Sequence, residues 1–111
     1  MANDLKVVVL IYSGRPDPQW QLTKSEAEHF LALFNNSINS ETEATIPSIL
    51  GYKGMRLMSA QKQFLLHNGL ITCFEQGHRS SKRDAEKNIE KYLLSTAPEK
   101  TLKVLKQLNI L

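Results

Sequence analysis

The residues with the greatest chemical potential in this sequence are crowded between Ser13 and Trp20. The segment reads SGRPDPQW and holds an arginine, an aspartate and the only tryptophan of the chain. Arginine forms bidentate contacts with carboxylates and phosphates, and arginine and tryptophan are enriched at interface hot spots. Arg15 could clamp an anion, Asp17 could orient it, and Trp20 could offer a stacking surface. The candidate binding residues here are Ser13, Arg15, Asp17 and Trp20.

The same segment also has a purely structural interpretation. Pro16 and Pro18 fix their own φ angles and push the residues before them into extended conformations, so the loop over residues 13–20 should be stiff. Stiffness lowers the entropy lost on ordering, whether the loop packs on its own domain or on a partner. In the structural interpretation Arg15 pairs with a nearby carboxylate and Trp20 plugs the edge of the core. Both interpretations stay open.

A short basic cluster, HRSSKR, covers residues 78–83. We expect a turn there that leads into a helix, whose first backbone N–H groups could help to bind a small anion or a nucleic-acid phosphate, together with Arg15. The alternative is a solvated turn whose charges pair with Asp84 and Glu86. The candidate anion-binding residues of the cluster are Arg79, Lys82 and Arg83.

Catalytic and metal-binding chemistry finds little support in the pattern. His29, His67, His78 and Cys73 lack the close spacing of zinc ligands. Cys73 lies in LITCF, a strand-like run in which a thiol is usually a small buried hydrophobe; catalysis would need an exposed, electropositive setting, for instance with His67 facing it. No glycine-rich nucleotide motif is present. We predict no catalytic residue, metal or cofactor, and favour a protein that is not an enzyme.

Composition indicates one globular domain. The chain has 111 residues, of which 41% are hydrophobic and 23% charged, within the range of folded domains. A single cysteine fits a reducing compartment. The N-terminal apolar run ends at Tyr12 and is too short for a signal peptide or a membrane span. We therefore expect a cytoplasmic protein without a membrane partner.

Charge is unevenly distributed. The net charge is +3. Residues 79–111 contribute 8 − 4 = +4 and residues 1–78 contribute 6 − 7 = −1. A nucleic-acid-binding domain usually shows a stronger basic face with a recognisable motif, so the asymmetry only weakly supports an anionic partner.

The first half of the chain predicts a strand, a loop and a helix. Residues 5–12 read as a strand with apolar side chains on both faces, which is typical of a central strand or of one covered on both sides. Thr23 and Glu26 form a capping box. The helix that follows should end near residues 35–36. Its expected core stripe is Ala27, Phe30, Leu31, Phe34 and Ile38. A polar connection should cover residues 39–45.

The second half predicts an antiparallel meander followed by two helices. Residues 52–58 read as a strand, and Asn68-Gly69 indicates a hairpin with arms at 62–67 and 70–75. Residues 75–79 should be a turn, and a helix capped within 81–84 should end near 95–96. Pro98 fits the first turn of a last helix. The predicted fold is therefore α+β, in the order β-α-β-β-β-α-α, with a mostly antiparallel sheet and the helices packed on one face.

Three segments of the chain resemble a small family of uncharacterised proteins: SGRPDPQW, GYKGMRLM and AEKNIEKYLL. That family shares a Ser-Gly-Arg-Pro-x-Pro-x-Trp segment and a Gly-Tyr-x-Gly segment. The resemblance spans most of the chain and implies a common fold. The resemblance implies no activity, cofactor or catalytic residue for this sequence.

Two functional hypotheses follow. The first is a non-catalytic binding or interaction protein that uses the rigid 13–20 loop as its contact surface. The second is a small-anion or nucleic-acid binder that uses Arg15 with the 78–83 cluster. The sequence identifies neither the partner nor the oligomeric state.

Overall fold

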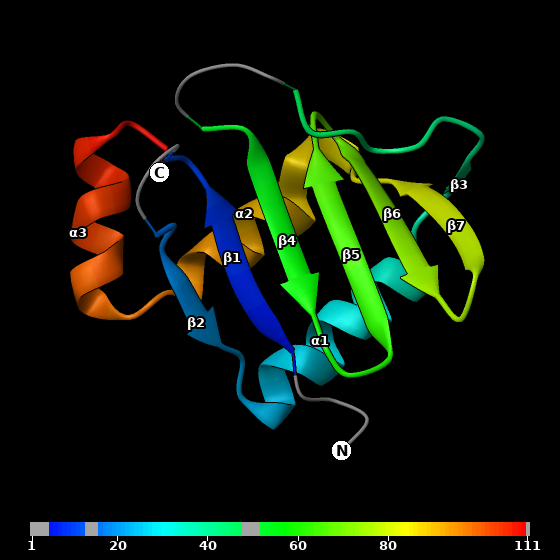
Figure 1. Ribbon diagram of the computed structural model, residues 1–111, viewed down its shortest axis with the longest axis horizontal. Helices are drawn as coiled ribbons and strands as arrows, with labels where there is room; N and C mark the ends of the chain where they lie inside the picture. The colour runs from blue at the N-terminus through cyan, green and yellow to red at the C-terminus, as the bar shows by residue number, and fades with distance from the viewer. Residues whose placement is uncertain (1–4, 13–15, 48–51, 111) are drawn as a thin grey trace.

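One antiparallel sheet crosses the whole molecule (Figure 1). The structure, a computed structural model, describes residues 5–12, 16–47 and 52–110. Within those residues the strands lie side by side in the order β2-β1-β4-β5-β6-β7-β3, and every pair is antiparallel. The strands are β1 (Lys6–Leu10), β2 (Gln19–Gln21), β3 (Asn39–Ser40), β4 (Gly54–Met58), β5 (Lys62–His67), β6 (Leu70–Glu75) and β7 (His78–Arg83).

The helices confirm the α+β class. They are α1 (Lys24–Asn35), a short 3-10 turn η1 (Ala85–Lys87), α2 (Asn88–Ser95) and α3 (Glu99–Gln107). α1 and α2 pass behind the sheet in Figure 1, and α3 lies beyond β2 at one end. None of the helices in the described ranges is long and apolar enough to cross a membrane.

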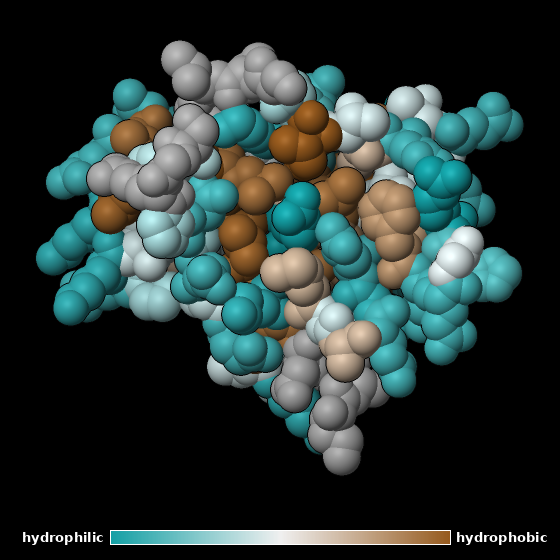
Figure 2. Space-filling model, in the orientation of Figure 1, coloured by the Kyte–Doolittle hydropathy of each residue, from teal (hydrophilic) through white to brown (hydrophobic). Residues whose placement is uncertain are grey.

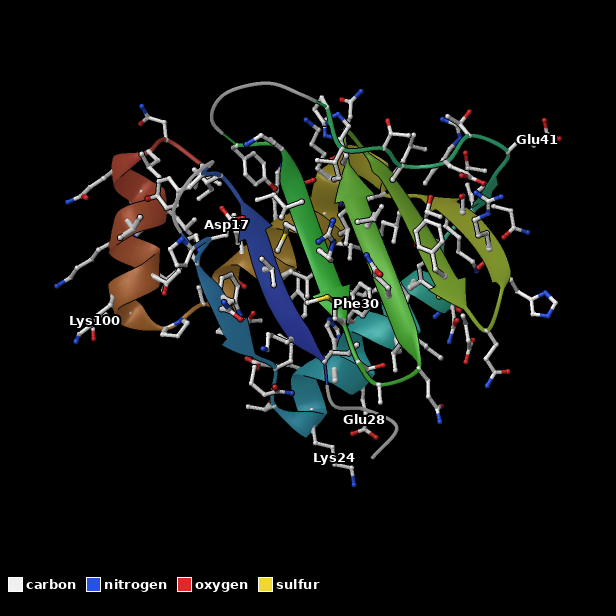
Figure 3. All side chains as sticks on the ribbon, in the orientation of Figure 1. Asp17, Lys24, Glu28, Phe30, Glu41 and Lys100 are labelled. Carbon is white, nitrogen blue, oxygen red and sulfur yellow. The ribbon has the colours of Figure 1, made fainter. Side chains whose placement is uncertain are left out.

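The hydrophobic core fills the space between the sheet and the two helices behind it. Alternate strand residues point into it, including Val7, Leu57 and Phe64, each at most 1% exposed. Phe30 of α1 lies behind the middle of the sheet (Figure 3) and packs edge-on against Phe64, with ring centroids 4.9 Å apart. Because β1 pairs with β2 on one side and β4 on the other, it is an interior strand, as its apolar sequence predicted.

The start and end of α1 agree with the sequence prediction. The Thr23 hydroxyl accepts a hydrogen bond from the Glu26 backbone N–H (3.1 Å), and the Glu26 carboxylate accepts one from the Thr23 N–H (2.9 Å). The helix ends at Asn35. The inclusion of Ile38 in the core stripe was wrong, because Ile38 lies beyond the helix and is 75% exposed.

The basic segment at residues 78–83 is a strand, β7, and the predicted turn into a helix was wrong. Gln76 and Gly77 have positive φ angles of 48° and 80° and reverse the chain after β6, so the meander continues by one more strand. The polar sequence of β7 is tolerated because, among the strands of the described residues, the two-residue strand β3 is its neighbour on the outer side.

Two other strands fall where the sequence predicted loops. Gln19, Trp20 and Gln21 pair with β1, so the loop predicted over 13–20 ends before Gln19. Asn39 and Ser40 pair with β7. Both strands have three residues or fewer, which is too short for a hydrophobic period to appear in the sequence.

The helix α2 begins later than predicted. Glu86 and Lys87 have φ angles of 54° and 59°, outside the helical region, so the helix starts at Asn88. The expected cap at Ser81 was wrong, because Ser81 lies in β7; instead the two carboxylate oxygens of Asp84 accept the N–H groups of Ile89 (2.7 Å) and Glu90 (2.9 Å). The predicted end near residues 95–96 is confirmed.

Candidate binding surface on the open face of the sheet

Asp17 has a structural role in the 13–20 segment. One of its carboxylate oxygens accepts hydrogen bonds from the backbone N–H groups of Ile11 (2.9 Å) and Tyr12 (2.7 Å). These groups follow the end of β1, where Asp17 is labelled in Figure 3. Asp17, which the sequence offered as a group to orient a ligand, thus satisfies the backbone after β1 through this oxygen. Ser13 and Arg15 lie outside the described residues.

Trp20 is a core residue. Its side chain is 7% exposed, and its indole N–H donates a hydrogen bond to the Thr96 hydroxyl at 2.9 Å. The Thr96 hydroxyl in turn donates to the Leu93 carbonyl, so the tryptophan ties β2 to the end of α2. The ring faces are covered by protein, and Trp20 therefore does not supply the exposed stacking surface considered from the sequence.

The basic residues of β7 point to opposite faces of the sheet. Lys82 faces the helices: its ammonium donates to the Asn35 carbonyl at 2.9 Å and lies 5.2 Å from the centroid of the Phe34 ring. It neutralises the negative end of the α1 dipole. Arg79 faces the other side and forms an exposed ion pair with Glu43 at 3.3 Å. The strand therefore does not gather the three basic side chains into one anion site.

Arg83 shares the face of Arg79 and is exposed. It also lines an open groove of about 460 Å³ between the end of α1 and the start of α2, together with Leu33, Ile38 and Ile89. Its backbone N–H donates to the Ile38 carbonyl. Arg83 is thus separated in the sheet from Lys82, its neighbour in the sequence.

Cys73 and His67 lie on opposite faces of the sheet. Cys73 faces the core and is 7% exposed, whereas His67 alternates to the other face and donates its Nδ1–H to the Lys53 carbonyl at 2.8 Å. Burial raises the pKa of the Cys73 thiol, with smaller opposing influences from Lys62 and Glu75. A thiol held protonated in this way is a poor nucleophile. The described residues also contain no group of three or more side chains suited to hold a metal ion.

A small polar cavity of about 160 Å³ lies at the start of β4, between that strand and α2. There the Tyr52 hydroxyl donates a hydrogen bond to the Glu90 carboxylate, with an O–O distance of 2.8 Å. Burial, and then the charge of Glu90, raises the pKa of Tyr52. This hydrogen bond joins the chain before β4 to α2, and the phenol of Tyr52 stays protonated.

The sheet face turned away from α1 and α2, here called the open face, carries a regular grid of side chains. The strand register places Val8, Arg56 and Leu65 in one row across β1, β4 and β5. Met58 and Phe74 belong to the next row, on either side of Gln63. Rows of this kind are about 6.5–7 Å apart, and neighbours within a row are about 5 Å apart.

An apolar area occupies the middle of this face. Figure 2 shows it over β1, β4 and β5, surrounded by polar side chains. Met58 is 36% exposed and the others are half-buried. We call this area, with the arginine at its centre, the open-face patch; its members are Val8, Leu10, Arg56, Met58, Leu65 and Phe74.

The charged strand residues on the open face are all basic. They are Lys6, Arg56, Arg79 and Arg83, and no aspartate or glutamate of the described strands shares this face. Of these four basic residues, Arg56 is the one that lies inside the open-face patch. Its Nε atom is buried and has no hydrogen-bond partner in the described part of the chain. Buried polar atoms without partners are rare in folded proteins.

Sequence reasoning overlooked the open-face patch as a site. Two signals could have found it: β1 is apolar on both faces, and Arg56 interrupts a strand that is otherwise apolar. The missing information was the pairing of the strands, since residues 8, 56, 65 and 74 become neighbours only through the sheet register.

No family model, curated protein or solved structure matches the chain. The resemblance of the 13–20 and 51–54 segments to a small family therefore stays a prediction.

Proposed function

We propose that the protein is a non-catalytic binding domain that holds a protein partner on the open face of its sheet. The observation that carries this proposal is the open-face patch: a contiguous apolar area on the side of the sheet opposite α1 and α2, with Arg56 inside it and a polar border. A contiguous exposed apolar area with a polar rim is typical of interaction sites.

The interior position of β1 supports the proposal. A strand with apolar residues on both faces normally has both faces covered. The core covers Val7 and Val9, which are 0% exposed, whereas Val8 and Leu10 on the other side are only half-buried. A partner protein that covers the open face would complete the burial of this strand.

The chemistry of the patch favours a protein over a nucleic acid. Single-stranded nucleic acids stack their bases on aromatic rings, and Phe74 is the only aromatic residue in the patch. The basic segment at 78–83 sends Arg79 and Lys82 to opposite faces, so it provides no continuous phosphate track. A cytoplasmic location, inferred from the single cysteine, belongs to the same proposal.

Site-specific photo-crosslinking tests the proposal. A benzophenone attached to Met58→Cys would report on the patch, and the same probe on Leu108→Cys, a residue directly after the end of α3 that is 44% exposed, would be the matched control. The native Cys73 is buried and should not take the label. Adducts formed in lysate of the source cells would be identified by mass spectrometry, and the partner would then be purified and its affinity measured.

We expect an adduct at position 58 that is missing at position 108. With the purified partner, Val8→Gln and Leu65→Gln should each weaken binding about tenfold or more, since each removes about 1.4 kcal/mol or more of apolar contact. Equal adducts at both positions, or an unchanged affinity in both folded variants, would contradict the proposal.

A further inference from the structure

We infer that the partner presents a carboxylate to Arg56 from the apolar face of a short amphipathic helix. This inference rests on the proposed function and adds the chemistry of the partner. It starts from the one charged side chain that the fold places inside the open-face patch, between Val8 and Leu65 on the neighbouring strands.

Arg56 is built into the patch in a form that suits a carboxylate. Its backbone is held on both sides by β1 and β5, so the position of the side chain is set by rigid elements. No hydrogen bond or ion pair joins its guanidinium to any other residue of the described chain, and its Nε is already buried. The buried Nε fixes the guanidinium in the sheet, and the two terminal nitrogens form a fork that matches the two oxygens of a carboxylate. The apolar neighbours would exclude water and strengthen the pair.

The charge of the face excludes a second copy of the same face as the occupant. In a face-to-face dimer Lys6 and Arg56 would find only basic strand residues on the opposite copy, and Arg79 is already paired with Glu43, so like charges would come together without acidic strand partners. An acidic partner gains from the same charges. Electrostatic complementarity of this kind also speeds association.

The strand pairing indicates that the partner is helical. β1, β4 and β5 are paired on both edges, so their backbone groups have no free N–H or C=O for a partner strand at the patch. A segment that lies flat on the apolar face must therefore satisfy its own backbone, as a helix does. From β1 to β6 the patch spans three strand spacings, or about 14 Å, which a helix of about ten residues covers.

Two synthetic peptides test the inference. The first is a helical peptide of about fourteen residues with leucines at i, i+3 and i+7 and a glutamate between them, and the second replaces that glutamate with glutamine. Binding would be followed by fluorescence anisotropy, and the contact face by amide chemical shifts in NMR spectra. Arg56→Gln removes the guanidinium, and Lys6→Gln is the matched control that removes an equal charge from the rim of the same face.

We expect the glutamate peptide to shift the resonances of β1, β4 and β5 and to bind the native protein about tenfold more tightly than the glutamine peptide. In Arg56→Gln this preference should disappear, whereas Lys6→Gln should weaken both peptides equally. A preference that survives in Arg56→Gln would overturn the pairing of Arg56 with a carboxylate.

The remaining outcomes separate this inference from the proposed function. If neither peptide perturbs the patch, or if a single-stranded oligonucleotide perturbs it instead, the inference of an acidic helix is wrong. The proposed function is judged independently by the crosslink at position 58. An adduct there with a partner that binds Arg56→Gln unchanged would keep the binding domain and discard the carboxylate.

Discussion

Two aspartates in this protein act on the backbone. Asp17 accepts the N–H groups of Ile11 and Tyr12 after β1, and Asp84 accepts those of Ile89 and Glu90 at the start of α2. Each aspartate supplies hydrogen-bond acceptors to backbone N–H groups that a strand end or a helix start would otherwise leave without a partner. Asp84 is 4% exposed, so water cannot easily substitute for it.

We expect Asp84→Ala to lower the free energy of unfolding by about 2 kcal/mol, because it removes a cap and leaves two buried N–H groups without acceptors. Urea denaturation would measure the change. The matched control is Glu86→Ala, an exposed acidic residue two positions later, which should change stability by less than about 0.5 kcal/mol. Equal effects of the two substitutions would contradict the capping role of Asp84.

The buried thiol of Cys73 should make stability depend on alkaline pH. Its pKa is raised above the ordinary value of about 9, chiefly by burial. The stabilisation is therefore complete below the unfolded pKa and is lost as pH rises through the folded pKa, because the unfolded state releases the proton first. We expect Cys73→Ala to cost less stability at about pH 10 than at about pH 7.5. A cost that stays constant or grows with pH would show that the thiol is not held protonated.

Among the elements, β4 depends on a glycine at its first position. Gly54 has a φ of +123°, and a Cβ there would collide with the Leu66 carbonyl oxygen of the neighbouring strand β5. Gly77 also has a positive φ, of +80°, but has open space around it. The two positions share a backbone requirement and differ in the contact with the next strand.

Gly54→Ala should therefore destabilise the protein by clearly more than Gly77→Ala. We expect about 1 kcal/mol for Gly77→Ala, from the left-handed backbone alone. For Gly54→Ala we expect more than about 3 kcal/mol, because the strand pair must also separate. The free energies of unfolding of the two variants would be compared from denaturant midpoints and m-values. If the two costs were equal, the close approach of β5 would not constrain residue 54.

Considered as a whole, the molecule carries an apolar area whose border is polar and includes the basic side chains of Lys6 and Arg79. The basic residues around the open-face patch should keep copies of the protein apart while leaving the patch free for an acidic partner. Self-association should then depend on these charges and on salt, which screens them.

Replacing Lys6 and Arg56 together by glutamine should promote dimerisation through the patch, measured by sedimentation velocity at low salt. The matched control, Lys24→Gln with Lys100→Gln, removes the same net charge from α1 and α3, away from the patch (Figure 3). It should leave the protein in its native association state. Equal association of both double variants would show that net charge, and not the patch, controls it.

Much of the architecture could be predicted because local signals were strong. The capping box defined the start of α1, and Asn68-Gly69 placed the hairpin between β5 and β6. Ile38 was misassigned because helical spacing continues past the residue at which the helix ends. β7 was missed because its six polar residues lack a strand pattern, and it is held by pairing with β6.

The candidate site was harder to anticipate for a physical reason. Local sequence sets strand alternation, helix caps and turns, because these depend on neighbours along the chain. The burial of Trp20 against Thr96, the separation of Arg79 from Lys82, and the meeting of Val8, Arg56 and Leu65 depend on strand order and register. Those contacts join residues far apart in the sequence, and it is the packing of α1 and α2 on one side of the sheet that leaves the open-face patch on the other side.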